Sequence, residues 1–247
     1  MLGAQIGRAA SLPVRHRSDL RRLTSLSPDM NEITEPPARA GEPDREVVGE
    51  VVSLPDGGRM LIRELLPSDR DELAERYLEL SPRARRLRFF NAPDHLSTRL
   101  LDYLVDVDGP DRSALVAFAI DDDGTPGVGI ARYVRSREEP SSAEAAVTVL
   151  DAYQNRGIAT ALLLRLAEEA RRNGISTFTA SVMWENRELL DGLRAFGAQV
   201  GPSEPGVASV RVALPPSEVD LPETELHRIL RVFAERVGDA IGLRFEH

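Results

Sequence analysis

Hydrophobic and polar positions become regularly spaced only after about residue 47, where two periods appear. Dense or alternating apolar runs bounded by Gly-, Pro- and Asp-containing turns predict strands, and apolar residues three and four apart predict helices that begin at Ser or Pro and end at Gly. Strands are predicted at 47–54, 60–65, 113–120, 127–135, 143–150 and 176–183, with two short ones in 198–214. Helices are predicted at 67–80, from Pro82 onward, and at 97–105, 157–173, 185–196 and 222–241.

The segments on either side of this region have other compositions. Residues 1–46 mix Arg, Ser, Pro and Glu with few clustered apolar side chains, so we expect a disordered tail, with Met30 as an alternative start. The helix predicted at 222–241 carries one apolar stripe that needs a partner surface, and a homodimer through this helix is one interpretation. We therefore divide the chain into a tail at 1–46, one domain at 47–216 and a C-terminal helical extension at 217–247.

Charge and composition exclude several classes of function. The 247 residues include 31 basic side chains, all of them arginine, against 40 acidic ones, and the net charge of −9 argues against a nucleic-acid partner. Without Cys the chain has no disulfide, no thiolate nucleophile and no cysteine-bound zinc, and its four His are scattered, so we predict no metal site. No apolar run approaches the roughly 18 residues of a membrane span, and we expect a cytoplasmic protein without a membrane partner.

The segment 143–160 holds the pattern that points most directly to chemistry. A predicted strand leads through a polar loop with Gly157 at the turn into a long helix. The unpaired N–H groups of the first helical turn and the helix dipole together favour an anion there, and a pyrophosphate would fit. The loop lacks G-x-G-x-x-G, and a chain without lysine has no P-loop Lys, so dinucleotide binding of the Rossmann type and P-loop hydrolysis match poorly.

The loop Gln154-Asn155-Arg156-Gly157-Ile158-Ala159 resembles the signature Gln/Arg-x-x-Gly-x-Gly/Ala of the GCN5-related N-acetyltransferases, the GNAT family. The resemblance extends over the following helix, the next strand and the helix from Asn186 to Gly197. Within residues 59–90, "IRELLPSDRDEL" and "ELSPRARRLRFF" are similar to the catalytic domain of actinobacterial protein lysine acetyltransferases. The resemblance implies an α/β (α+β) fold, in which a mostly antiparallel sheet contains one parallel, splayed strand pair and is flanked by helices.

The resemblance also implies acetyl-CoA as cosubstrate and a set of residues that bind it. The backbone of Val147, Thr148 and Val149 would pair with the pantetheine arm like an added strand. The pyrophosphate would lie on the backbone of the loop and first helical turn, which comprise Gln154, Asn155, Arg156, Gly157, Ile158, Ala159 and Thr160. Arg156 would add a charged contact, and Asn186 would reach the pantetheine or the thiol end. The simpler alternatives are a helix N-cap for Asn186 and plain strand core for the two valines.

Glu144 is the catalytic candidate. Acetyl transfer to an amine requires that the amine lose a proton, and a carboxylate at the start of strand 143–150 suits a general base acting directly or through water. The resembling lysine acetyltransferases carry Glu at this position; the alternative is a solvated residue at a strand end. Many relatives place Tyr seven residues after the Asn as a general acid, but this chain has Leu193, and Tyr153 and Tyr133 are the nearest alternatives.

From these residues we expect an acyltransferase that moves acetyl directly from acetyl-CoA to a primary amine, with a protein lysine as the first acceptor. A small-molecule amine acceptor, or a non-catalytic acyl-CoA sensor, are the alternatives. We interpret the arginines at 83, 85, 86 and 88 as the solvated face of a helix.

Overall fold

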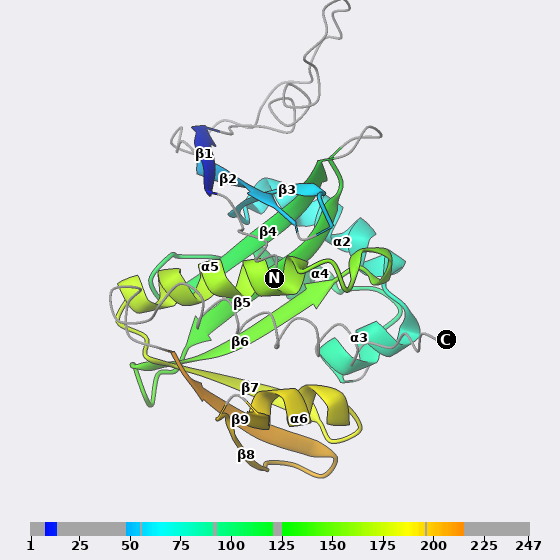
Figure 1. Ribbon diagram of the computed structural model, residues 1–247. Coiled ribbons are helices and arrows are strands. Elements are labelled where there is room, and N and C mark those ends of the chain that lie inside the picture. The colour runs from blue at the N-terminus through cyan, green and yellow to red at the C-terminus, as the bar shows by residue number, and fades with distance from the viewer. Residues whose placement is uncertain are drawn as a thin grey trace, which may run out of the picture.

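The computed structural model describes residues 8–13, 48–54, 56–90, 93–120, 125–195 and 197–214. Within these ranges, nine strands form one sheet in the order β1-β2-β3-β4-β5-β6-β7-β9-β8, with helices on both faces (Figure 1). The strands are β1 (Arg8–Pro13), β2 (Val48–Ser53), β3 (Arg59–Glu64), β4 (Arg112–Ile120), β5 (Gly127–Arg135), β6 (Ser142–Val149), β7 (Thr177–Met183), β8 (Gln199–Pro202) and β9 (Val207–Ala213). The helices are η1 (Pro67–Asp69), α2 (Arg70–Glu79), α3 (Pro82–Phe89), α4 (Thr98–Val105), η2 (Asp151–Tyr153), α5 (Ile158–Arg172) and α6 (Arg187–Ala195).

The predicted fold class is confirmed, since β6 and β7 are parallel and the other strand pairs in the sheet are antiparallel. Most predicted elements from residue 47 to 214 are present with ends shifted by one or two residues. None of the helices described in these ranges is long and apolar enough to cross a lipid bilayer.

The prediction of a disordered tail at residues 1–46 is wrong for six residues. Residues 8–13, which we expected in a disordered tail, form β1 and pair with β2, with Ser11 opposite Glu50. Without β1, β2 would be a sheet edge with unpaired backbone N–H and C=O groups, and such an edge can pair with an extended segment of modest apolar content. The rest of the predicted tail, and the C-terminal helix with its proposed dimer contact, lie outside the described residues.

Helix α5 covers one face of the central strands (Figure 1). Its apolar stripe, which includes Leu162 and Leu166, packs on the side chains of β4, β5 and β6 that point to this face, and these residues form the largest core cluster. Gly129 of β5 permits the close approach, because a Cβ there would lie 3.2 Å from Leu162 Cδ1 and 3.3 Å from the Thr148 carbonyl oxygen.

Helices α2, α3 and α4 cover the opposite face. Ser81 caps α3 by accepting a hydrogen bond from the Ala84 N–H, and Ser97 caps α4 in the same way from Leu100. Ser81 also donates from Oγ to Asp151 Oδ1 at 2.7 Å, which joins the start of α3 to η2 in the segment between β6 and α5. The helices on the two faces are thus tied together at one end of β6.

A buried ion pair positions α2. Arg63 of β3 is 7% exposed, and its two terminal nitrogens each lie 2.7 Å from a carboxylate oxygen of Asp69, which is 12% exposed. Asp69 Oδ2 also accepts the Leu66 N–H at 2.8 Å. Because removing one partner leaves a charge buried without compensation, we expect this pair to hold the start of α2 on the sheet.

We predict that Asp69→Ala lowers the free energy of unfolding by about 3–5 kcal/mol, the range for breaking a buried ion pair. Urea denaturation measures the effect. Asp71→Ala is the control, because Asp71 is 93% exposed with a loose contact to Arg70, and its removal should change stability by less than about 1 kcal/mol. Equal effects of the two substitutions would contradict the role given to the Arg63–Asp69 pair.

Candidate active site

Strands β6 and β7 pair along only part of their length. Their parallel register joins Ser142 to Thr177, Ala143 to Phe178 and Glu144 to Thr179, and no pair follows although both strands continue. Strand β7 turns away with β9, β8 and α6 (Figure 1), and β9 pairs with it along its whole length. The backbone of residues 145–149 is therefore a strand edge that faces an opening in the sheet.

The loop after β6 prepares the N-terminus of α5 for an anion. Asn155 and Gly157 adopt the left-handed conformation, with φ of 62° and 85°. The Gln154 side chain donates from Nε2 to the Val149 carbonyl at 3.1 Å, which holds the loop against the end of β6. No side chain caps α5, so the N–H groups of its first turn have no partner in the helix and point toward the loop. The first turn of α5 therefore leaves backbone N–H groups available at the positive end of the helix.

Two buried side-chain oxygens in this region have no hydrogen-bond partner. They are Thr160 Oγ1, in the first turn of α5, and Asn186 Oδ1, just before α6. The Asn186 carbonyl accepts the Leu190 N–H at 3.1 Å, but its side-chain oxygen makes no bond, so helix capping does not account for this residue. A buried polar group without a partner is unfavourable, so a ligand that accepts from the Thr160 hydroxyl or donates to Asn186 Oδ1 would remove a cost.

Arg156 lies beside the loop but already has a partner. Its Nε is 2.6 Å from Asp56 Oδ2 in the turn between β2 and β3, and its guanidinium lies over the Tyr153 ring. Burial alone would raise the pKa of Asp56, but hydrogen bonds from the Gly58 N–H and from Arg156 outweigh it and lower that pKa. The guanidinium is thus held at the outer side of the predicted phosphate site.

The side chains of β6 divide between the two faces of the sheet. Val147 and Val149 pack toward α5, so the core interpretation of their side chains is correct, while the backbone edge stays available. Ala146 and Thr148 line a pocket between the sheet and helices α2, α3 and α4, and by alternation Glu144 projects from the same face as they do. Glu144 is exposed, at the point where β6 and β7 separate.

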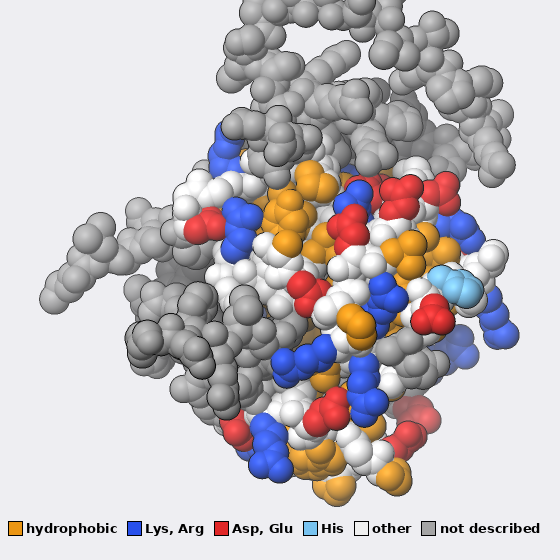
Figure 2. All heavy atoms as spheres, turned by 90° about the vertical axis from the view of Figure 1, so that its right-hand side faces the viewer, with side chains coloured by type: hydrophobic (Ala, Val, Ile, Leu, Met, Phe, Trp, Pro, Cys, Tyr) orange, Lys and Arg blue, Asp and Glu red, His pale blue; other side chains and the backbone are white. Residues whose placement is uncertain are grey.

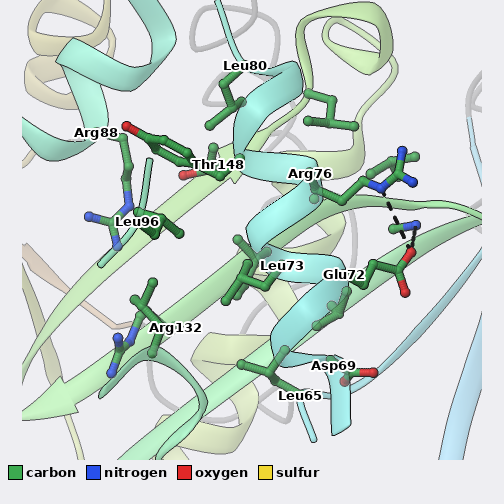
Figure 3. A pocket seen from close by; sticks show the side chains of 18 of the residues that line it. Leu65, Asp69, Glu72, Leu73, Arg76, Leu80, Arg88, Leu96, Arg132 and Thr148 are labelled. Atoms are coloured by element: carbon green, nitrogen blue, oxygen red, sulfur yellow. Dashed lines mark hydrogen bonds and ion pairs between the residues drawn. The ribbon is translucent and has the colours of Figure 1, made fainter. Parts of the chain in front are cut away.

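The pocket has about 780 Å³ of empty space, including its open mouth. Its walls are mostly apolar side chains of α2, α4 and the sheet, and α2 crosses in front of it (Figure 3). Arg132 of β5, which we did not single out, and Arg88 of α3 project toward the same side, away from Asp69 and Glu72 (Figure 3). Arg132 lies opposite Ala146 in the register of β5 and β6.

The interpretation of the arginine run as a solvated face is wrong for Arg88. Arg85 donates to the carbonyl oxygens of Leu80 and Leu78, and Arg86 forms a surface ion pair with Glu185, whereas Arg88 lines the pocket. The four arginines are on a short helix whose last turn faces the sheet. Because the residues are identical, the sequence does not show which of them points to the sheet. Arg132 had a usable signal, because it is a charged residue between Ala131 and Tyr133 in the middle of a mostly apolar strand.

Of the two tyrosines considered as a general acid, Tyr133 has its hydroxyl in other hydrogen bonds and Tyr153 packs in the loop. Tyr133 is fully buried, donates to the Gly109 carbonyl and accepts from Asn173 Nδ2. Tyr153 packs between two core clusters with Arg156 against its ring. Leu193 is 4% exposed in the apolar core between α6 and the strands β7, β8 and β9.

A mostly antiparallel sheet with one splayed parallel strand pair, followed by an uncapped helix, places the chain in the acetyltransferase class. Comparison with known proteins agrees. The sequence model of the acetyltransferase (GNAT) family matches residues 70–191. The chain is 37% identical over 155 residues to "Acetyltransferase PA5475" of Pseudomonas aeruginosa. The aligned residues make up 63% of this chain and 82% of that protein. This chain belongs to the GNAT family of acetyltransferases.

The resemblance to actinobacterial acetyltransferases is also confirmed. "Acetyltransferase Pat" of Mycolicibacterium smegmatis is 29% identical over 195 residues, covering 77% of this chain and 56% of that protein, so this chain matches about half of that relative. The crystal structure of the GNAT domain of S. lividans PAT superposes with a TM-score of 0.60 at 30% identity, over 67% of this chain and 97% of that domain.

We predict that Asn186→Ala weakens acetyl-CoA binding roughly three- to tenfold, because one hydrogen bond to the ligand is lost. Isothermal titration with acetyl-CoA measures the affinity. Stability should change by less than about 1 kcal/mol, because Asn186 Oδ1 has no partner to lose. Asp191→Ala, on the exposed side of α6, is the control and should leave binding unchanged. A loss of stability without a loss of affinity would identify Asn186 as a structural residue instead.

Proposed function

We propose that the chain transfers acetyl directly from acetyl-CoA to a primary amine, with Glu144 as the general base. The observation that carries the proposal is the end of β6–β7 pairing at Glu144, which puts a carboxylate at the mouth of an opening and beside a pocket. The base is therefore next to the point where a donor in the opening and an acceptor in the pocket would meet.

In this proposal acetyl-CoA binds to backbone and side-chain groups that have no hydrogen-bond partner within the chain. The backbone edge at 145–149 would pair with the amides of the pantetheine arm as an additional strand does. The N–H groups of residues 155–160 would hold the pyrophosphate at the positive end of α5. The Thr160 hydroxyl would donate to the pyrophosphate, and Asn186 Oδ1 would accept a hydrogen bond from an amide N–H of the pantetheine arm. Acetyl-CoA supplies a thioester, whose acyl carbon is open to attack by an amine.

The reaction then needs one proton removed and one supplied. Glu144 takes a proton from the amine, directly or through water, while the amine nitrogen bonds to the acyl carbon and the carbon–sulfur bond breaks. The sulfur leaves with the bonding electron pair and is protonated to give the free thiol. Because Leu193 is in the core and Tyr133 and Tyr153 are engaged, solvent water is the source of this proton in our proposal.

Two classes of primary amine are candidate acceptors. A protein lysine is the acceptor that the resemblance to the actinobacterial enzymes implies. A small amine is the second candidate, and the pocket under α2 favours it, because a mostly apolar lining with a few charged groups lies between three helices and the sheet. Incubation of lysates with labelled acetyl-CoA followed by mass spectrometry separates the two. The chain has no lysine of its own, so lysine-bound label would belong to another protein.

We predict that Glu144→Gln lowers kcat by about 10²- to 10⁴-fold with an accepted amine, the usual contribution of a general base. Steady-state rates of CoA release across pH measure the effect, and acetyl-CoA affinity should stay within about twofold of the unmodified chain. Glu138→Gln removes the same charge from an exposed position before β6 and should retain full activity.

Full turnover by Glu144→Gln at every pH would show that Glu144 is not the base. Binding of acetyl-CoA with neither hydrolysis nor product on any amine would instead indicate the acyl-CoA sensor.

A further inference from the structure

One end of the pocket holds two guanidinium groups without anionic partners. Arg132 is 5% exposed, and its Nε and Nη2 are buried with no hydrogen-bond partner. Arg88 lines the same pocket, and Figure 3 shows both side chains projecting toward the same side. Among the described residues, no carboxylate forms an ion pair with either guanidinium. Buried cations are ordinarily paired, so this end of the pocket is prepared for an anion that the chain itself does not provide.

Several other arginines within the described ranges form ion pairs. Arg63 is bound by Asp69, Arg86 lies 3.1 Å from Glu185, and Arg112 is bound by Asp106 and Asp108. On the face that includes α3, arginine and acidic side chains are interspersed and form no continuous basic patch (Figure 2). Arg132 thus differs from Arg63, the other buried arginine of the described residues, which has a carboxylate partner.

The surroundings of the two arginines oppose their charge. Burial lowers the pKa of Arg132, and burial together with the charge on Arg132 lowers that of Arg88 to about 10. The charge of Glu144 acts in the opposite direction on both, which shows that all three groups lie within electrostatic range. The Tyr103 ring, 4.6 Å from the Arg132 Cζ, offers a cation–π contact but no charge.

The rest of the pocket is suited to an apolar group. Leu73, Leu96 and Phe118 are among its lining side chains. The two carboxylates on the other side of α2 are engaged, since Asp69 binds Arg63 and Glu72 Oε1 accepts the Gly127 N–H at 3.1 Å. Arg76 also lines the pocket, but it forms ion pairs with Glu72 and Glu79. The pocket therefore offers one cationic end without an ion pair and one apolar region.

We infer that Arg88 and Arg132 bind the carboxylate of the acceptor, which is an α-amino acid with an apolar side chain or a close analogue. This inference rests on the proposed function. Planar guanidinium groups bind carboxylates through two parallel hydrogen bonds. Arg132 lies opposite Ala146, which is two residues from Glu144 on the same face of β6. A carboxylate on Arg132 would thus bring an α-amine close to Glu144, and the positive charges would favour the neutral amine that reacts.

The test compares matched acceptors that differ only in the carboxylate: phenylalanine with phenethylamine, and leucine with isoamylamine. With the full chain and acetyl-CoA, we expect kcat/KM for the amino acid to exceed that of its amine by about tenfold or more, the effect of a charged hydrogen bond. Arg132→Gln and Arg88→Gln should each reduce this ratio toward one by lowering only the amino-acid value.

Three variants control the interpretation. Arg99→Gln removes an exposed arginine of α4 outside the pocket and should retain the ratio. Arg132→Lys keeps the charge but loses the planar donor pair, so we expect an intermediate ratio of the two kcat/KM values. This variant replaces Arg132→Gln in the test if Arg132→Gln folds poorly. Binding of 3-phenylpropanoate, followed by ligand-observed NMR without acetyl-CoA, tests the subsite apart from the reaction, and it should weaken in Arg132→Gln and Arg88→Gln.

Three results would overturn the inference. One is an equal kcat/KM for amino acid and amine in the unmodified chain, and another is a ratio that the two glutamine variants leave unchanged. The third is a change in preference for succinyl-CoA over acetyl-CoA in these variants, which would assign the arginines to the acyl donor. If no amine reacts, the proposed function fails, and binding of 3-phenylpropanoate still decides whether the subsite exists.

Discussion

The separation of β6 from β7 after Glu144 and Thr179 is the constraint on which the rest of the site depends. Up to that pair the two strands satisfy each other's backbone groups; beyond it β7 follows β9, and the edge of β6 is left open. In a continuous sheet this edge would be paired with β7 along its length and could not accept another strand. The family's use of acetyl-CoA is thus explained by a sheet that is incomplete at one place.

The alternation of β6 lets one strand serve three purposes. Its side chains toward α5 belong to the core, its backbone edge faces the opening, and its side chains on the other face belong to the pocket. The two faces are fixed relative to each other by the hydrogen bonds between Ser81 and Asp151, which connect α3 to η2. A donor held on the α5 side and an acceptor held under α2 would therefore meet at a defined position beside Glu144.

The sequence predicts those features of the site that are set by neighbouring residues, and it does not predict those that depend on tertiary packing. The loop 154–159 and its helix could be located because turn, cap and helix are set by neighbouring residues, and Leu193 could be recognised as a departure by counting from Asn186. Arg88 and Arg132 could not be brought together, since α3 and β5 meet only through tertiary packing. The pairing of β1 was missed for the same reason, because an edge strand accepts partners of weak pattern.

Amide hydrogen exchange with and without acetyl-CoA tests the central claim most directly, because it reports on the backbone of β6 itself. The account predicts slower exchange for amides within residues 145–149 and 155–160 when acetyl-CoA is added, with β8 at the far edge of the sheet unchanged. Unchanged exchange in 145–149 at saturating acetyl-CoA would contradict it, since the open edge of β6 would then not receive the ligand.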